Sequence, residues 1–190
     1  PGLMPIPARA DAVVQAVHQW LTDSSDGLNA QLALLRARYS PALSSGQLPD
    51  VATFDQWTHR TSEGRSIKAP YLSIVLTGIT PELEPNSRFF DHTVQITIVV
   101  LDRDIQGAMP DAAQAAWRYY DGLVQLHTLR NSSATPGKPT GVTLFNGGTV
   151  ATGRVIHSSL GSARLVKDAA VDAGNFAIRS ILTVRLAEDY

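Results

Sequence analysis

A period-two alternation of apolar and polar side chains marks the most regular stretch of the chain. The segment 92–104 is rich in β-branched residues and contains neither Gly nor Pro. Every second residue from Val94 to Val100 is apolar, and polar residues alternate with them from Thr93 to Thr97. A charged cluster then ends the segment abruptly. The pattern predicts a central strand with one buried face.

Two further segments show the same alternation. The first, 70–79, precedes the central strand, and strands adjacent in sequence commonly pair antiparallel, so we predict a hairpin whose long tip is 80–91. The last, 176–187, has one apolar face and one mixed face that carries Arg179 and Arg185. Helices covering one side of a sheet would account for these two unlike faces.

Turn residues divide the region between these strands. Asn146-Gly147-Gly148 is the strongest hairpin signal in the chain and predicts a strand pair over 142–145 and 149–160. The stretch 158–174 mixes Gly, Ser and Asp with a few apolar residues, which predicts a shortened strand or a flexible tip.

Apolar residues at helical spacing predict three helices. The first spans 10–21, and the second spans 28–39 with Asp26 as its N-cap. The third and longest spans 112–126 and begins near Pro110. Between the second helix and the first strand, the segment 40–69 shows no clear period, which is compatible with a loop containing one short helix.

The order of elements predicts an α+β fold, a mostly antiparallel sheet with helices packed on one face and long loops or arms for oligomer contacts. The length fits a single domain over 1–190. Within it we expect an extended N-terminal arm at 1–9 and loop insertions at 40–69 and 131–141.

Composition narrows the possible functions. Hydrophobic residues make up 44% and charged residues only 17%, which suits a globular chain with surface meant for other proteins. The formal net charge of −1 gives no general attraction to nucleic acid or to an anionic membrane, although a local basic patch remains compatible with it. The chain has no cysteine, and no apolar run approaches the length of a membrane helix. We therefore expect a soluble intracellular protein without a membrane partner.

Two groups of side chains offer weak catalytic patterns. Asp102-Arg103-Asp104 ends the central strand, where paired carboxylates can bind a divalent metal, but the Gly and third ligand of a calcium loop are missing. Asp91 could orient His92 as a base, but no nucleophile motif accompanies them. The histidines lack zinc-enzyme spacing. We predict no catalytic, cofactor or metal site; the alternative is a small metal-dependent hydrolase or nuclease using Asp91, His92, Asp102 and Asp104.

Four aromatic residues lie in segments without a clear period and are either core anchors under loops or partner-facing anchors. They are Phe54, Trp57, Phe89 and Phe90. Arg88 beside Phe89-Phe90 makes that loop the first interface candidate. The full set of candidate subunit-interface residues is Arg88, Phe89, Phe90, Asp102, Arg103, Asp104, Arg179 and Arg185.

The order of elements resembles that of the tail terminator and neck (head-to-tail connector) proteins of long-tailed bacteriophages. The likeness rests on an amphipathic first helix ending in Trp20-Leu21, the strands 71–76 and 93–102, the helix 113–126 and the final strand 178–186. It spans most of the chain and is carried by hydrophobic pattern and element order, without a signature of chemical groups.

The resemblance implies a non-enzymatic virion protein that needs no cofactor. Such proteins form rings, usually hexamers, that cap the tail tube and dock it beneath the head. The implied partners are further copies of the chain, the tail tube protein and head connector or adaptor proteins, with DNA passing through the lumen without sequence-specific binding. Assembly is expected in the host cytoplasm. The segments 40–69 and 131–141 lengthen the chain beyond compact members, which leaves open a terminator, a connector ring or another tail-completion role; a generic binding module is a further alternative.

Overall fold

The structure, a computed structural model, describes residues 9–57, 70–82, 88–101, 105, 112–131, 149–150, 153–167 and 175–188. Its helices are α1 (Arg9–Thr22), α2 (Leu28–Arg38) and α3 (Ala112–Asn131). Its strands are β1 (Thr53–Gln56), β2 (Tyr71–Pro81), β3 (Phe89–Leu101), β4 (Thr149–Val150), β5 (Gly153–Lys167) and β6 (Asn175–Glu188). None of these helices is long and apolar enough to cross a membrane.

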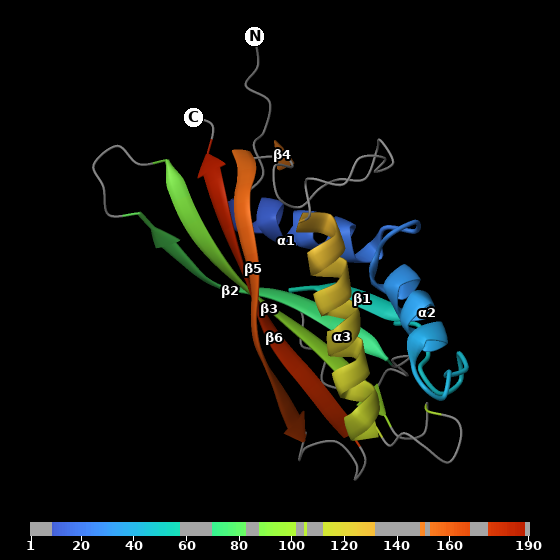
Figure 1. The fold of residues 1–190 in the computed structure, drawn as a ribbon. Coiled ribbons are helices and arrows are strands. Elements are labelled where there is room, and N and C mark those ends of the chain that lie inside the picture. The colour runs from blue at the N-terminus through green and yellow to red at the C-terminus, as the bar shows by residue number, and fades with distance from the viewer. Residues whose placement is uncertain are drawn as a thin grey trace.

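The strands form one sheet in the order β1-β2-β3-β6-β5-β4. The pair β1–β2 is parallel, and every other neighbouring pair is antiparallel. Figure 1 shows the three helices on one side of this strongly twisted sheet. The predicted α+β fold with a mostly antiparallel sheet is therefore confirmed, as is the predicted β2–β3 hairpin pairing.

The two central strands, β3 and β6, have one buried and one less covered face. Register places Val94 opposite Leu182 and Ile98 opposite Ile178, and these side chains are buried under the helices. The residues between them point to the other side of the sheet because successive side chains alternate. We call this second side the open face; on β6 it carries Arg179, which is exposed.

The helical layer packs closely on itself and on the sheet. A Cβ atom at Gly122 of α3 would lie 2.9 Å from Leu32 Cδ2 and 3.1 Å from Leu28 Cδ1, both on α2. Tyr119 and Leu123 of the same helix are fully buried in the core. A glycine thus lets α2 and α3 approach more closely than most side chains would permit.

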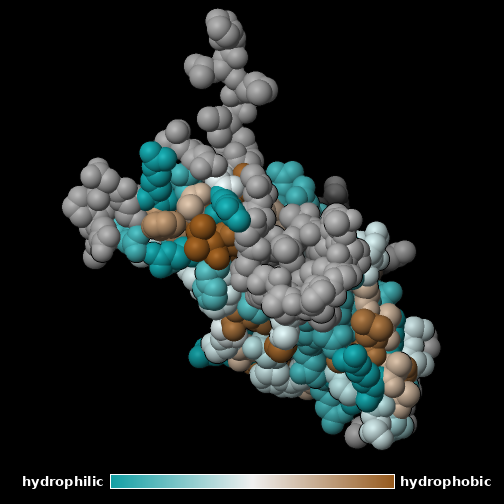
Figure 2. Space-filling view, turned by 45° about the horizontal axis from the view of Figure 1, so that its top comes forward, coloured by the Kyte–Doolittle hydropathy of each residue, from teal (hydrophilic) through white to brown (hydrophobic). Residues whose placement is uncertain are grey.

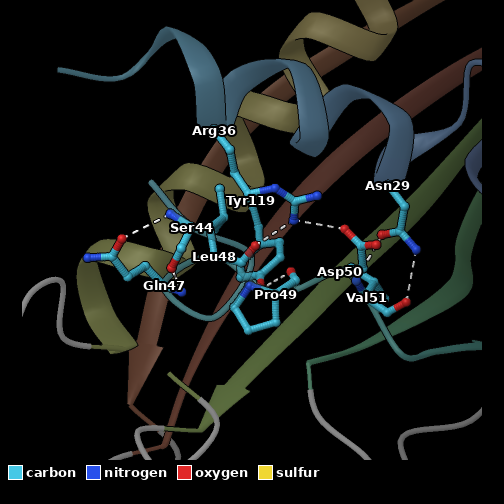
Figure 3. A network of polar contacts seen from close by, with 9 residues as sticks. All are labelled: Asn29, Arg36, Ser44, Gln47, Leu48, Pro49, Asp50, Val51 and Tyr119. Atoms are coloured by element: carbon cyan, nitrogen blue, oxygen red, sulfur yellow. Dashed lines mark hydrogen bonds and ion pairs between the residues drawn. The ribbon is translucent and has the colours of Figure 1, made fainter. Parts of the chain in front are cut away.

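The chain that follows α2 belongs to this layer. Leu48 and Val51 are buried in the core, so the described part of the segment 40–69 packs into the molecule. The Tyr119 hydroxyl donates a hydrogen bond of 2.6 Å to the Pro49 carbonyl. Figure 3 shows this bond within a larger network.

Two side chains of α2 complete that network. Arg36 donates from Nη1 to the Leu48 carbonyl at 2.7 Å and to the Asp50 carboxylate at 2.9 Å. The Asn29 amide accepts from the backbone N–H of Val51 at 2.8 Å and donates to its carbonyl at 3.1 Å. Side-chain amides and guanidinium groups thus satisfy backbone groups that no sheet partner reaches in this irregular segment.

Two local features differ from expectation. The segment 51–57 contains β1, which was not predicted because a strand of four residues is too short to show a period, and residues 58–69 of the segment expected to hold a short helix lie outside the described residues. The N-cap of α2 is Gly27 without a side-chain bond, whereas the Asp23 carboxylate accepts the backbone N–H groups of Ser25 and Asp26 at 2.9 Å and 3.0 Å. Asp26 is therefore not the cap.

Two strands are longer than expected. β2 continues past Gly78 to Pro81 because a bulge between Leu76 and Gly78 absorbs the irregularity. β5 runs to Lys167, where a shortened strand or a tip was expected, and contains two register shifts. The predicted hairpin turn at 146–148 lies outside the described residues.

Candidate interaction surfaces

One end of the sheet gathers charged and aromatic residues on its open face. The Arg185 guanidinium donates a hydrogen bond of 2.5 Å to Glu82 and lies 4.0 Å from the Asp91 carboxylate. It also lies 5.3 Å from the centre of the Phe89 ring. Arg88 is exposed next to Phe89. We call Glu82, Phe89, Asp91 and Arg185 the sheet-end cluster; it joins two of the candidate interface residues.

Phe90 lies on the other side of the same end and faces the helices. The Arg9 guanidinium of α1 lies 4.3 Å from the centre of its ring and donates to the Glu188 carboxylate at 2.6 Å. Glu188 is only 4% exposed and closes β6. Phe90 thus takes part in an internal contact that fastens α1 to the sheet.

His92 is fully buried beside this contact. Burial lowers the pKa of its imidazole, against weaker opposing effects of the Phe90 and Val184 backbone and of the Glu188 charge. Among the described residues, neither ring nitrogen of His92 has a hydrogen-bond partner. The backbone groups of Phe90 and Val184 are nevertheless close enough to raise its pKa slightly. Burial therefore favours the neutral form of the His92 imidazole.

The geometry does not support an Asp91–His92 catalytic pair. Asp91 pairs across the open face with Arg185, whereas His92 is buried on the helix side, since neighbours on a strand point in opposite directions. Asp102, Arg103 and Asp104 lie outside the described residues. Within the described ranges no three His, Asp or Glu side chains gather as metal ligands.

His127 of α3 contacts β5 and α1. Its Nε2 lies 3.2 Å from the Ser158 hydroxyl, and its ring meets the Trp20 ring edge-on at 6.3 Å. Burial lowers the pKa of this imidazole as well. These contacts give His127 a packing role between α1, α3 and β5.

Arg179 lies on the open face away from the sheet-end cluster. Its partner across the β5–β6 pair is Arg164, and both side chains are exposed. Sequence reasoning missed Arg164 because the glycine at 161 interrupts the pattern there. The signal that could have found it is the alternation of Ala163 and Leu165 with Arg164 and Val166.

The aromatic residues outside the periodic segments include both core anchors and exposed side chains, the two possibilities left open by the sequence. Phe54 packs inward, edge-on to His18 at 6.4 Å, whereas Trp57 is 40% exposed with a φ of 65°. Trp117 is 43% exposed on α3, although its spacing fitted the apolar pattern of that helix. A helix with apolar residues on more than one side is the signal that could have revealed Trp117. On the face in Figure 2, apolar surface outside the grey atoms occurs in separate small patches.

The fold has a counterpart among solved structures. No family model matches the chain, and no curated protein matches its sequence. A chain in a solved structure described as the virion of a native gene transfer agent particle has a similar fold, with a TM-score of 0.52. The two sequences are 13% identical, and the match covers 94% of this chain and 97% of the other.

Proposed function

We propose that this chain is a structural virion protein, a ring-forming tail terminator or neck subunit that caps the tail tube and joins it to the head connector. The observation that carries the proposal is the fold shared with a virion chain along nearly the whole of both chains. The order of elements, with its likeness to terminator and neck proteins, supports the same role. On this proposal the protein is not an enzyme and acts through protein contacts alone.

A closed ring needs two different complementary patches on each subunit, because neighbours meet head to tail. Two exposed regions on different elements offer such patches. The sheet-end cluster presents Phe89, which is 37% exposed, among charged residues. The outer side of α3 presents Trp117 and Val124, which are 43% and 39% exposed. Aromatic anchors of this kind contribute most of the binding energy in protein interfaces.

Electron microscopy and light scattering of the purified protein test the proposal. We expect rings, sixfold in most particles, and a molar mass well above that of one chain. A strict monomer at high concentration, together with no ring on tail tubes or in virions, would refute the role.

Single substitutions then test the two patches. Phe89→Ser and Trp117→Ser should each weaken ring assembly by about tenfold or more, as expected for interface anchors. Leu34→Ser is the matched control, because Leu34 is 51% exposed but lies on α2, which contributes to neither patch. Rings that survive both substitutions would show that these patches are not the contacts, while the ring role itself would stand.

A further inference from the structure

Arg164 and Arg179 form an arginine pair on the open face. They lie directly opposite each other on β5 and β6, where like charges destabilise a sheet. Within the described part of the chain, neither side chain makes an ion pair or a hydrogen bond. By contrast, Arg9, Arg36 and Arg185 each contact a carboxylate. The pair therefore carries an electrostatic cost that nothing within these residues offsets.

The rest of this half of the open face is also basic. Arg154 of β5 points to the open face and is exposed; it lies opposite Ala187, near the sheet-end cluster and eight residues along β6 from Arg179. The only carboxylate on β5 and β6 belongs to Glu188, which is buried on the helix side with Arg9. A chain with a formal net charge of −1 thus concentrates positive charge on one half of one face. Such a surface attracts an anionic partner.

Hydroxyl groups lie between the charged positions. Thr93, Thr183 and Ser159 occupy one row across β3, β6 and β5, between the row of the arginine pair and that of Arg185. Guanidinium and hydroxyl groups are the usual contacts to phosphate oxygens. A protein interface would instead centre on aromatic or large apolar anchors, and the exposed aromatic Phe89 on this face lies on β3 in the sheet-end cluster, away from the arginine pair.

We propose that the arginine pair, assisted by Arg154 and the hydroxyl row, binds the phosphodiester backbone of DNA without reading its sequence. The described part of the open face presents no helix or ribbon to a groove, so recognition is limited to phosphate charge. The proposal goes beyond the ring role. It rests on that role only in one respect: the DNA that is bound would be the DNA passing through the lumen of the ring. Binding itself is a property of the single chain.

Fluorescence anisotropy with a labelled duplex of random sequence tests the proposal across a series of salt concentrations. We expect micromolar affinity at low salt, with the logarithm of the association constant falling linearly as the logarithm of salt rises, since counterions are released. Arg164→Glu and Arg179→Glu should each weaken binding about tenfold or more and make that slope shallower by about one. Arg164→Lys and Arg179→Lys, which keep the charge, should bind almost as the original chain does.

The control is Arg38→Glu, which makes the same charge change at an exposed position on α2. It should change affinity by no more than about threefold, because screening confines charge effects to roughly ten ångströms. Circular dichroism confirms that each variant is folded. Absence of duplex binding at low salt, or an equal loss in Arg38→Glu, would overturn the proposal.

Light scattering and electron microscopy of the same samples separate this proposal from the ring role. If the charge reversals dissolve the oligomer and leave duplex affinity intact, the face is an interface between copies and the DNA proposal is wrong. Rings that form without binding DNA overturn only the DNA proposal. DNA binding that follows the arginine variants in a monomer supports it and refutes the ring.

Discussion

The buried imidazole of His92 should make stability depend on pH. Burial holds its pKa in the folded chain below the ordinary value near 6.5, so the unfolded chain binds the proton more readily. The stabilisation is therefore complete above about pH 6.5 and is lost as the pH falls below that value. His127 acts in the same direction.

We expect the free energy of unfolding, measured with urea, to fall between pH 7.5 and pH 5.5, by up to about 1.4 kcal/mol per site and pH unit. His92→Leu should reduce this dependence, while the His127 contribution remains. The control is His157→Leu, which removes an exposed imidazole; because the charge of His157 helps to lower the pKa of His127, only a small flattening is expected from this change. An equal flattening of the pH profile in the control would show that burial at position 92 is not the cause.

Trp57 adopts a backbone conformation that disfavours side chains. Its φ of 65° lies in the left-handed region, which costs a residue other than glycine about 1–2 kcal/mol. Trp57→Gly should therefore be about 1 kcal/mol more stable than Trp57→Ala in urea unfolding. Equal stability of the two variants would mean that the loop relaxes once the indole is gone.

The contact between α2 and α3 depends on the missing side chain at Gly122. Gly122→Val should destabilise the chain by about 2–3 kcal/mol, because its methyl groups would overpack the buried Leu28 and Leu32. Gly122→Ala should cost much less, since the gain in helix propensity of about 1 kcal/mol offsets part of the clash. Urea unfolding of the two variants measures the difference, and an equal cost for both would contradict close packing.

The segment 40–57 is held to the helices by hydroxyl and amide groups. Tyr119→Phe should cost about 1–2 kcal/mol, because it leaves the Pro49 carbonyl without its buried donor. Tyr39→Phe is the matched control, since its bond of 2.7 Å to Asp121 is solvent-exposed and its loss should cost under about 1 kcal/mol. A larger loss in the control would contradict the importance of the buried bond.

The whole molecule depends on its last strand. β6 lies between β3 and β5 in the sheet. The sheet is therefore complete only when residues far apart in the sequence are paired, such as Ile96 and Ser180, which are 84 positions apart. A chain ending at Lys167 would expose both of these neighbours and should lose its cooperative unfolding transition. Circular dichroism during urea titration measures this. A sharp transition in the shortened chain would show that β3 and β5 can form a stable sheet without β6.

Much of the fold was predictable because periodicity is local. The alternation in β3 and β6 and the spacing of apolar residues in α1 and α3 reflect which side of each element meets the core. This information is contained in residues that are close together in the sequence. β1 and the full length of β5 could not be predicted, since a four-residue strand has no period and bulges break one. Of the candidate interface residues, Phe89 and Arg185 were found together, whereas Arg103 lies outside the described residues.

The sequence alone determined the α+β class, the buried face of each central strand and the place of the arginines on the mixed face of β6. Only the tertiary structure decided that β6 lies between β3 and β5, that Arg179 faces Arg164, and that Trp117 is exposed. The physical reason is that side-chain direction follows from local backbone geometry, whereas strand order, register and helix burial depend on contacts between distant parts of the chain.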